Sequence, residues 1–264
     1  MNEFIIKLVF SFIIGSVWIV LLSIFSERFG SKIGGAIAGI PATMVVSLLF
    51  IALTQDAAQA VQSTTVIPLM LGVNALLVLI FVLLLRFGFL ISFFSSILFW
   101  FIISFIFKII NFDNFIFSVI GYLLCVGITY YMLEHKLHIK SVAGKKIRYT
   151  SFQIFGRCLI AGITIVSSVV LANISGPLLG GIFASFPAMT IALILMLHAD
   201  HDDNTTVALL KNFIIVGTLN VVIFTLSIRY TYLVLGIAYG TILSILLSIL
   251  SAYFLYYSVN KKMS

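Results

Sequence analysis

Two prolines and two asparagines stand at matching places in two apolar stretches of the sequence: Pro41 and Asn74 in the first, Pro187 and Asn220 in the second. Proline inside a helix removes one backbone hydrogen bond and leaves polar backbone groups exposed. An asparagine amide in an apolar helix must also find a partner. In a membrane such groups are tolerated against protein or against a wet cavity, where they can bind a substrate. We therefore predict a substrate-binding site that comprises Pro41, Thr43, Asn74, Pro187, Thr190 and Asn220.

A purely structural interpretation of these residues is also open. Asparagine side chains can bond neighbouring membrane helices together, and the hydroxyls of Thr43 and Thr190 can bond the backbone of their own helices. Glycines close to the two prolines would let the helices pack closely, so that each proline would add only a tolerated kink. The predicted helix-packing glycines are Gly34, Gly35, Gly180 and Gly181.

Asp56 and Asp202 occupy equivalent positions just after the two proline-containing stretches. Ionisable side chains in membrane helices often mark proton or cation pathways, and we predict that these two carboxylates bind a coupling ion. The alternative is that each aspartate caps the helix that follows it. The spacing of Asp56 and Gln59 is typical of a capping box and favours that alternative.

The segment from His198 to Asp203 gathers imidazole and carboxylate groups that could hold a divalent metal. The first stretch has no matching cluster, since Ala52, Thr54 and Gln55 stand at the aligned positions. We therefore interpret the segment as a solvated loop and predict no metal site. No phosphate loop, nucleophile elbow, zinc-protease motif or dinucleotide fingerprint occurs in the sequence. We predict no catalytic residue and no cofactor, and hence a protein that is not an enzyme.

The composition indicates that membrane helices carry these residues. Hydrophobic residues make up 62% of the chain and charged residues 9%, against about 25% charged residues in a soluble domain. A soluble fold is excluded, because so little polar surface cannot keep the chain in water. The net charge of +7 does not indicate a nucleic-acid partner, since most basic residues stand at the ends of apolar runs. We interpret Cys125 and Cys158 as small core residues.

The apolar runs predict an all-α, polytopic bundle of about nine transmembrane helices. The first run is too long for the core of a signal peptide, and we interpret it as a retained helix. The predicted helices cover residues 4–25, 33–53, 64–85, 88–107, 115–133, 152–173, 178–198, 206–227 and 231–257.

The basic residues predict an orientation. Five of them, Lys136, Lys140, Lys145, Lys146 and Arg148, stand between the fifth and sixth predicted helices, and the positive-inside rule places such a loop in the cytoplasm. The N-terminus is then outside and the C-terminus cytoplasmic, with 12 of the 15 Lys and Arg residues on the inner side. This layout is typical of a multi-pass protein of a prokaryotic cytoplasmic, or inner, membrane.

The sequence repeats itself at a constant offset of 146 residues. A G-x3-GG-x2-A-x2-PA string begins at Gly30 and again at Gly176, and the register continues to Asn74 and Asn220. Each repeat would contain four helices. Because five helices precede the second repeat, we predict that it is inserted upside down relative to the first. The predicted domains are a first repeat at 1–110, a linker helix with a basic loop at 111–150, and a second repeat at 151–264.

The stretch from Gly180 to Pro187, followed by an apolar run, a polar turn and another helix, resembles the small GlpM-like membrane proteins. Pro41 holds the equivalent place in the first half. Those proteins have four helices and look like a single copy of this unit, so the resemblance implies a fold rather than an activity. The plan of inverted repeats is also similar to that of the drug/metabolite transporters, in architecture alone.

Inverted repeats are common among secondary transporters, whose substrate sites lie near the bilayer midplane between the repeats. We therefore expect a secondary transporter or exporter of a small molecule or lipid-linked solute that works by alternating access. Its neighbours would be membrane lipids, it would have no nucleic-acid partner, and a homodimer is left open. The alternative is a non-transporting scaffold or subunit of an envelope-biosynthesis complex, whose helices could stay packed and dry.

Overall fold

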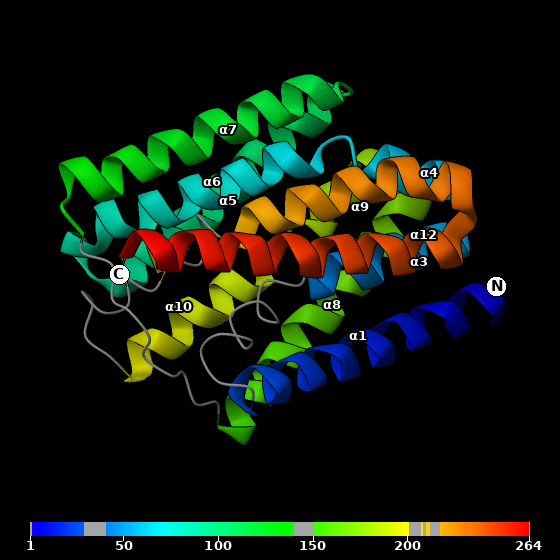
Figure 1. Ribbon diagram of the computed structural model, residues 1–264, viewed down its shortest axis with the longest axis horizontal. Helices are drawn as coiled ribbons and strands as arrows, with labels where there is room; N and C mark the ends of the chain where they lie inside the picture. The colour runs from blue at the N-terminus through cyan, green and yellow to red at the C-terminus, as the bar shows by residue number, and fades with distance from the viewer. Residues whose placement is uncertain are drawn as a thin grey trace.

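The computed structural model describes residues 2–28, 41–139, 150–200, 207, 210–211 and 217–263. Every regular element in these ranges is a helix, which confirms the predicted all-α class there. The helices, labelled as in Figure 1, are α1 (Asn2–Arg28), α3 (Ala42–Thr54), α4 (Ala57–Ser63), α5 (Ile67–Leu84), η1 (Leu85–Phe87), α6 (Phe89–Ile109), α7 (Phe115–Tyr131), η2 (Met132–Lys136), α8 (Ser151–Ser175), α9 (Pro177–Ala184), α10 (Ala188–Asp200) and α12 (Thr218–Met263).

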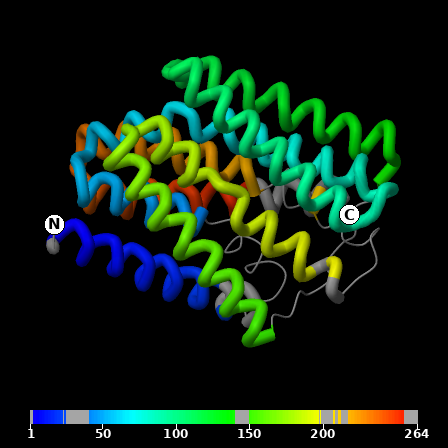
Figure 2. The backbone as a smooth tube through the Cα atoms, turned by 180° about the vertical axis from the view of Figure 1, so that it is seen from behind, coloured from blue at the N-terminus to red at the C-terminus, as the bar shows by residue number. Residues whose placement is uncertain are grey.

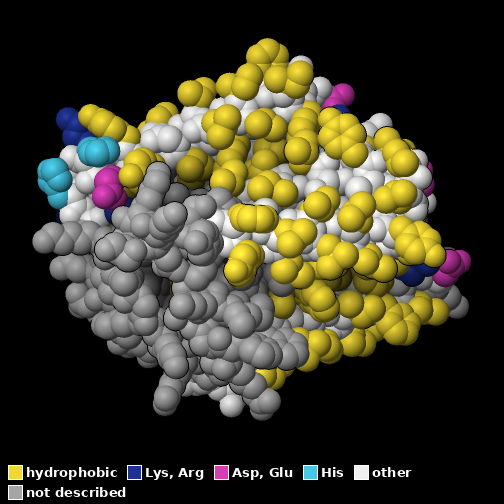
Figure 3. Space-filling model, in the orientation of Figure 1, with side chains coloured by type: hydrophobic (Ala, Val, Ile, Leu, Met, Phe, Trp, Pro, Cys, Tyr) yellow, Lys and Arg dark blue, Asp and Glu magenta, His cyan; other side chains and the backbone are white. Residues whose placement is uncertain are grey.

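Seven helices in the described part of the chain are long and apolar enough to cross a membrane. Their outward side chains are hydrophobic. Phe94 and Phe105 of α6, for example, are 63% and 66% exposed, an arrangement that water opposes and lipid favours. On the face shown in Figure 3, hydrophobic side chains form a broad band and charged side chains lie at its two ends. These features indicate an integral, multi-pass membrane protein.

The seven candidate spans compare with about nine helices predicted from the sequence. Two places account for the difference. Helix α3 has only 13 residues, and residues 29–40 before it lie outside the described ranges. The span Thr218–Phe254 counts once, although α12 reverses its direction at Gly236, where φ is 74° (Figures 1 and 2). The count of nine stays a prediction.

Most helices run along the long axis of the molecule, and the two ends of the chain lie at opposite ends of it (Figures 1 and 2). We call the end of the molecule where α1 begins the N-end, and the opposite end, where α12 ends, the C-end. Helix α1 runs toward the C-end, and α8, packed beside it, runs the other way. The same opposition holds between α5 and the part of α12 before Gly236, and between α6 and the part after it.

Elements recur at the offset of the sequence repeat. Helices α3 and α10 cover residues 146 apart, Ala42–Thr54 and Ala188–Asp200. Gly88, between η1 and α6, and Gly236, inside α12, both combine a positive φ with an extended ψ, a conformation that glycine adopts without steric cost. Each of these glycines separates the third helix of its half from the fourth.

Small residues bring α1 and α8 into close contact. A Cβ atom at Gly15 of α1 would lie 2.3 Å from the terminal methyl group of Ile165 of α8, so a larger residue would require that side chain to move. Cys158 of α8 is buried in the same contact, where its thiol donates to the carbonyl of Ser16 at 3.6 Å. Cys125 of α7 is half-buried, and neither cysteine forms a disulfide. Both thiols therefore serve as small packing groups, as predicted.

Candidate functional site

The helix predicted at 178–198 is broken into two shorter helices at Pro187. Helix α9 ends at Ala184 and α10 begins at Ala188. Proline has no N–H to donate to the carbonyl four residues back, and the carbonyl of Phe183 instead accepts from the nearer N–H of Phe186 at 3.1 Å. Regular bonding resumes where Ile191 N donates to the carbonyl of Pro187 at 2.8 Å. The break leaves irregular backbone inside an apolar span.

Asn74 of α5 bonds directly to this break. Its Nδ2 donates to the backbone carbonyl of Ser185 at 2.9 Å, and its Oδ1 accepts from the indole Nε1 of Trp100 at 2.8 Å. Asn74 is 5% exposed and Trp100 fully buried. Because the indole can only donate and the carbonyl can only accept, this environment allows one orientation of the amide. The side chain therefore joins the first half of the chain to the broken helix of the second.

Asn220 forms a similar bridge at the equivalent place. Its Oδ1 accepts from the hydroxyls of Ser248 and Ser251, both in the part of α12 after Gly236. Ser248 follows Trp100 by 148 residues, as Gly236 follows Gly88, whereas Asn220 follows Asn74 by 146. The second half therefore has two more residues between Asn220 and Gly236 than the first half has between Asn74 and Gly88. In both halves an asparagine on the third helix bonds a side chain on the fourth.

The remaining residues of the predicted substrate site are placed as follows. Pro41 immediately precedes α3, and its carbonyl accepts from Val45 N at 2.9 Å. Thr43 is half-buried in the first turn of α3, and Thr190 is buried in the first turn of α10. The structure thus brings Asn74 to the break beside Pro187 and joins Asn220 to the fourth helix of its own half.

The glycines of α9 are packing positions by geometry. A Cβ atom at Gly181 would lie 2.1 Å from the backbone carbonyl oxygen of Ser63, and one at Gly180 would lie 2.6 Å from Cβ of Ala172. Helix α9 thereby rests against the end of α4 and against α8 without room for a side chain. Gly34 and Gly35, the predicted counterparts, lie outside the described ranges.

The capping alternative describes Asp56. Its Oδ1 accepts from Gln59 N at 2.8 Å, which makes Asp56 the N-cap of α4. Asp202 lies outside the described ranges, as do His201 and Asp203. His198, at the end of α10, stacks on the ring of Phe89 with centroids 3.6 Å apart. The coupling-ion role of the two aspartates stays a prediction.

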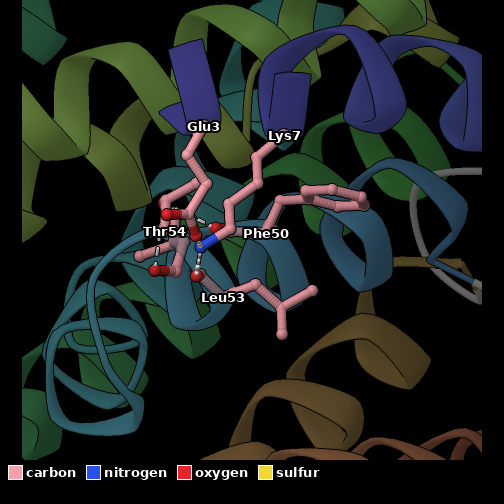
Figure 4. Close-up of polar contacts among 6 residues, drawn as sticks. Glu3, Lys7, Phe50, Leu53 and Thr54 are labelled. Carbon is pink, nitrogen blue, oxygen red and sulfur yellow. Dashed lines mark hydrogen bonds and ion pairs between the residues drawn. The ribbon is translucent and has the colours of Figure 1, made fainter. Parts of the chain in front are cut away.

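Basic side chains at the N-end cap the C-terminal carbonyls of helices. Lys7 pairs with Glu3 at 2.7 Å and donates to the carbonyl of Leu53, near the end of α3, at 3.0 Å (Figure 4). Lys108 donates to the carbonyl of Ser175, the last residue of α8, at 3.3 Å. Arg229 reaches the carbonyl of Val61 in α4 at 3.4 Å. Positive charge at these positions complements the helix dipoles.

Sequence reasoning missed an ion pair at the C-end in which the lysine is buried and the glutamate is partly exposed. Lys211 is 2% exposed and the one charged side chain buried within the described ranges. It pairs with Glu134 of η2 and donates to the carbonyl of Ile139 at 2.7 Å. The signal was present, because Lys211 stands inside the apolar run 206–227, and ionisable residues inside membrane helices are by default functional candidates.

Two regions of the chain, residues 8–112 and 154–261, match one protein family, described as protein of unknown function (DUF3147). The chain belongs to this family. The matched regions begin 146 residues apart, at the offset of the sequence repeat, so the chain contains a duplicated unit. No curated protein and no solved structure matches it. The likeness to GlpM-like proteins stays a prediction.

The two matched regions are hereafter called the first and second repeat. The polar contacts described above can be assigned to one repeat, to both, or to the segment between them. Each repeat holds one of the asparagine bridges, Asn74 with Trp100 and Asn220 with Ser248. Helix α7 and η2 lie between the matched regions. Glu134 therefore belongs to neither repeat, whereas its partner Lys211 belongs to the second.

Proposed function

We propose that the protein is a secondary transporter of a small molecule or lipid-linked solute, in which two repeats of opposite orientation move against each other. The observation that carries this proposal is the helix broken at Ser185–Pro187. The backbone carbonyl of Ser185 accepts a hydrogen bond from Asn74 of the other repeat. Paired repeats with a discontinuous helix near the middle of the membrane are the common plan of such carriers. No catalytic chemistry is part of the proposal.

The opposite directions of equivalent helices support the inverted arrangement. Helices α1 and α8 run in opposite directions, as do α5 and the part of α12 before Gly236 (Figures 1 and 2). Helix α7 lies between the two repeats in sequence and adds an odd crossing, which would invert the second repeat. With the basic loop in the cytoplasm, the N-end would face outside and the C-end would face the cytoplasm.

The break offers a substrate a place to bind. A hydrogen bond within a protein stabilises it by only about 1 kcal/mol net, so a substrate donor can replace Asn74 at the carbonyl of Ser185 at little cost. The amide would then be free to bond the substrate as well. Thr190, one turn from Pro187, adds a hydroxyl. In the conformation described here the amide occupies the carbonyl, which corresponds to a closed site.

A lateral groove supports an apolar or lipid-linked solute. It lies between α1 and α8 with a volume of about 470 Å³, and its lining is hydrophobic apart from Ser16, Ser151 and Cys158. Val17 and Phe155 on its walls are 52% and 62% exposed, so the groove opens toward the side of the bundle. A hydrophobic tail could reach it from the bilayer.

A thermal-shift screen on the purified protein tests whether a ligand binds at the break. A ligand at a concentration of 100 times its Kd stabilises the protein by about 2.7 kcal/mol, so a true substrate should raise the unfolding midpoint clearly. The matched variant Thr190→Val removes one hydroxyl at the break and should reduce that shift. If every stabilising compound acted equally on both proteins, the proposed site would be wrong. A scaffold protein would show no such ligand.

Side-specific labelling tests the inversion independently of any substrate. Phe87 and Leu235 stand just before Gly88 and Gly236, in equivalent turns, and are 54% and 44% exposed. With both native cysteines replaced by alanine, Leu235→Cys should react with an impermeant thiol reagent on intact cells. Phe87→Cys should react only after the membrane is opened.

Two exposed positions calibrate this experiment. Asp113→Cys, before α7, should label from outside like position 235, and Lys136→Cys, after α7, should label only from inside. Labelling of positions 87 and 235 from the same side would mean that the repeats run parallel. The alternating-access proposal would then lose its main support.

A further inference from the structure

Helix α7 is packed tightly against the first repeat along α5. A Cβ atom at Gly72 of α5 would lie 3.0 Å from both the Cα of Tyr122 and the Cβ of Cys125. Leu69 N, in the first turn of α5, donates to the hydroxyl of Ser118 at 2.9 Å. Close contact through small residues leaves little freedom to slide or to admit water. Helix α7 therefore belongs mechanically to the first repeat.

Polar contacts join α7 to the second repeat at three levels. At its first residue, the guanidinium of Arg229 lies 4.6 Å from the ring centroid of Phe115. Near its middle, the hydroxyls of Tyr122 and Thr218 are 3.1 Å apart. Beyond its end, in the π-helical turn η2, Glu134 pairs with Lys211. The two charged contacts thus lie at opposite ends of one membrane-spanning helix.

The charged contacts also occupy equivalent places in the two repeats. Arg229 donates to the hydroxyls of Thr64 at 3.3 Å and Thr65 at 3.1 Å, where α4 meets α5. Lys211 follows Thr65 by 146 residues, the offset of the duplication. A cationic hydrogen bond is therefore formed at Thr65 in the first repeat, at the N-end, and at the aligned residue Lys211 in the second repeat, at the C-end.

We infer that Arg229 with Phe115 and Thr65, and Lys211 with Glu134, are two releasable latches that close the N-end and the C-end of the bundle. The inference rests on the proposed function, in which the two latches would be the gates that close the transport path at either end. Loss of Glu134 would leave the buried ammonium of Lys211 with the carbonyl of Ile139 but without a negative charge, which is unfavourable. The C-end latch can therefore open only if water reaches Lys211, so its opening is coupled to access from that end.

A double-mutant cycle measures the interaction free energy between Glu134 and Lys211, the two residues of the C-end latch. Unfolding midpoints are measured for the purified wild type, E134Q, K211Q and the double variant, with K136Q, an exposed lysine of the same turn, as the control. Each single variant should unfold below the control, and the double variant should lose less than the two single losses together. Additive losses would overturn the latch. If E134Q fails to fold, the reversed pair E134K/K211E should restore folding.

Side-specific labelling then tests whether each latch is a gate. Ile194 is fully buried in α10 and shares a hydrophobic cluster with Leu210, the neighbour of Lys211, while Ile67 is fully buried two residues after Thr65. In the cysteine-free background, E134Q should speed labelling of Ile194→Cys from the C-end side on the order of tenfold or more. R229Q should do the same for Ile67→Cys from the N-end side. K136Q and K108Q, an N-end cation outside the latch, should change neither.

The outcomes separate the two ideas. Coupling in the cycle without any change in labelling would keep the ion pair as a stabilising contact and overturn the gates, while the transporter proposal would still be decided by the ligand screen and the labelling of positions 87 and 235. Faster labelling at both positions in every variant would mean general loosening and would overturn the latches alone, since a ligand that stabilises the break could still be found.

Discussion

Replacing Asn74 by leucine is expected to lower the free energy of unfolding by several kcal/mol. The variant leaves two buried groups without partners, the carbonyl of Ser185 and the indole N–H of Trp100. At about 1–3 kcal/mol for each buried polar group left unsatisfied, the loss should be roughly 2–6 kcal/mol. Neither group can turn toward another partner, because one is backbone and the other is fixed by the packed ring.

Asn220→Leu is the matched control. The groups that donate to its Oδ1 are hydroxyls that can rotate, and the Ser251 hydroxyl can instead donate to the carbonyl of Ser248, which lies 2.9 Å away. The loss should therefore be clearly smaller than for Asn74→Leu. Both free energies can be measured by reversible denaturation in the same detergent or bicelle system. Equal losses would mean that the bond from Asn74 to the broken helix has no special weight.

Gly181→Val should be nearly as damaging, for a steric reason. The added Cβ would stand 2.1 Å from the backbone oxygen of Ser63, so α9 or α4 would have to move. Overpacking of a buried contact typically costs about 1–3 kcal/mol, and a clash with backbone lies at the upper end of that range or above it. Lower yield and a lower unfolding midpoint are the expected readouts.

Gly156→Ala provides the comparison for this prediction. Gly156 lies within α8, and a Cβ atom there would meet nothing within 4 Å. Alanine should be neutral or stabilising by up to about 1 kcal/mol, because it restricts the unfolded chain. If Gly181→Val behaved like Gly156→Ala, the close approach of α9 to α4 would be wrong.

Long apolar runs made most of the helices predictable. The runs at 88–107 and 152–173 correspond to α6 (Phe89–Ile109) and α8 (Ser151–Ser175) within a few residues. The family match to two regions confirms the duplication that the spacing of glycine and proline indicated. Periodic composition and repetition are local properties of a sequence, so they can be read without knowledge of the packing.

The sequence placed one turn wrongly. The prediction put a break between 227 and 231, where Arg229 interrupts the apolar run, whereas the helix continues to the turn at Gly236. Arg229 stays within the helix because Val61, Thr64 and Thr65 accept its hydrogen bonds. A charged residue in an apolar run indicates a loop when the sequence is considered alone. The partners of Arg229 lie more than 160 residues away in the chain, so the sequence does not reveal them.

The residues of the candidate site could be predicted from the sequence, but the hydrogen-bonded and ion pairs that they form could not. Proline and asparagine in apolar helices drew attention to Asn74 and Pro187 from the sequence. That Asn74 would bond the break, and that Glu134 would pair with Lys211, depended on how helices pack across 111 and 77 residues of chain. No local pattern encodes such pairs, and Glu134 stands just outside the predicted helix at 115–133.

The bond between Asn74 and Ser185 also sets an order of events during synthesis. Its two partners are separated by 111 residues, so at about 5–20 residues per second the ribosome needs roughly 6–22 s to deliver the second after the first. Throughout that interval the contact surfaces for α9, which include the amide of Asn74 and the backbone carbonyl of Ser63, have no partner in the nascent chain. Slow translation of the residues between the two partners would lengthen the time for which the amide of Asn74 lacks its acceptor at Ser185.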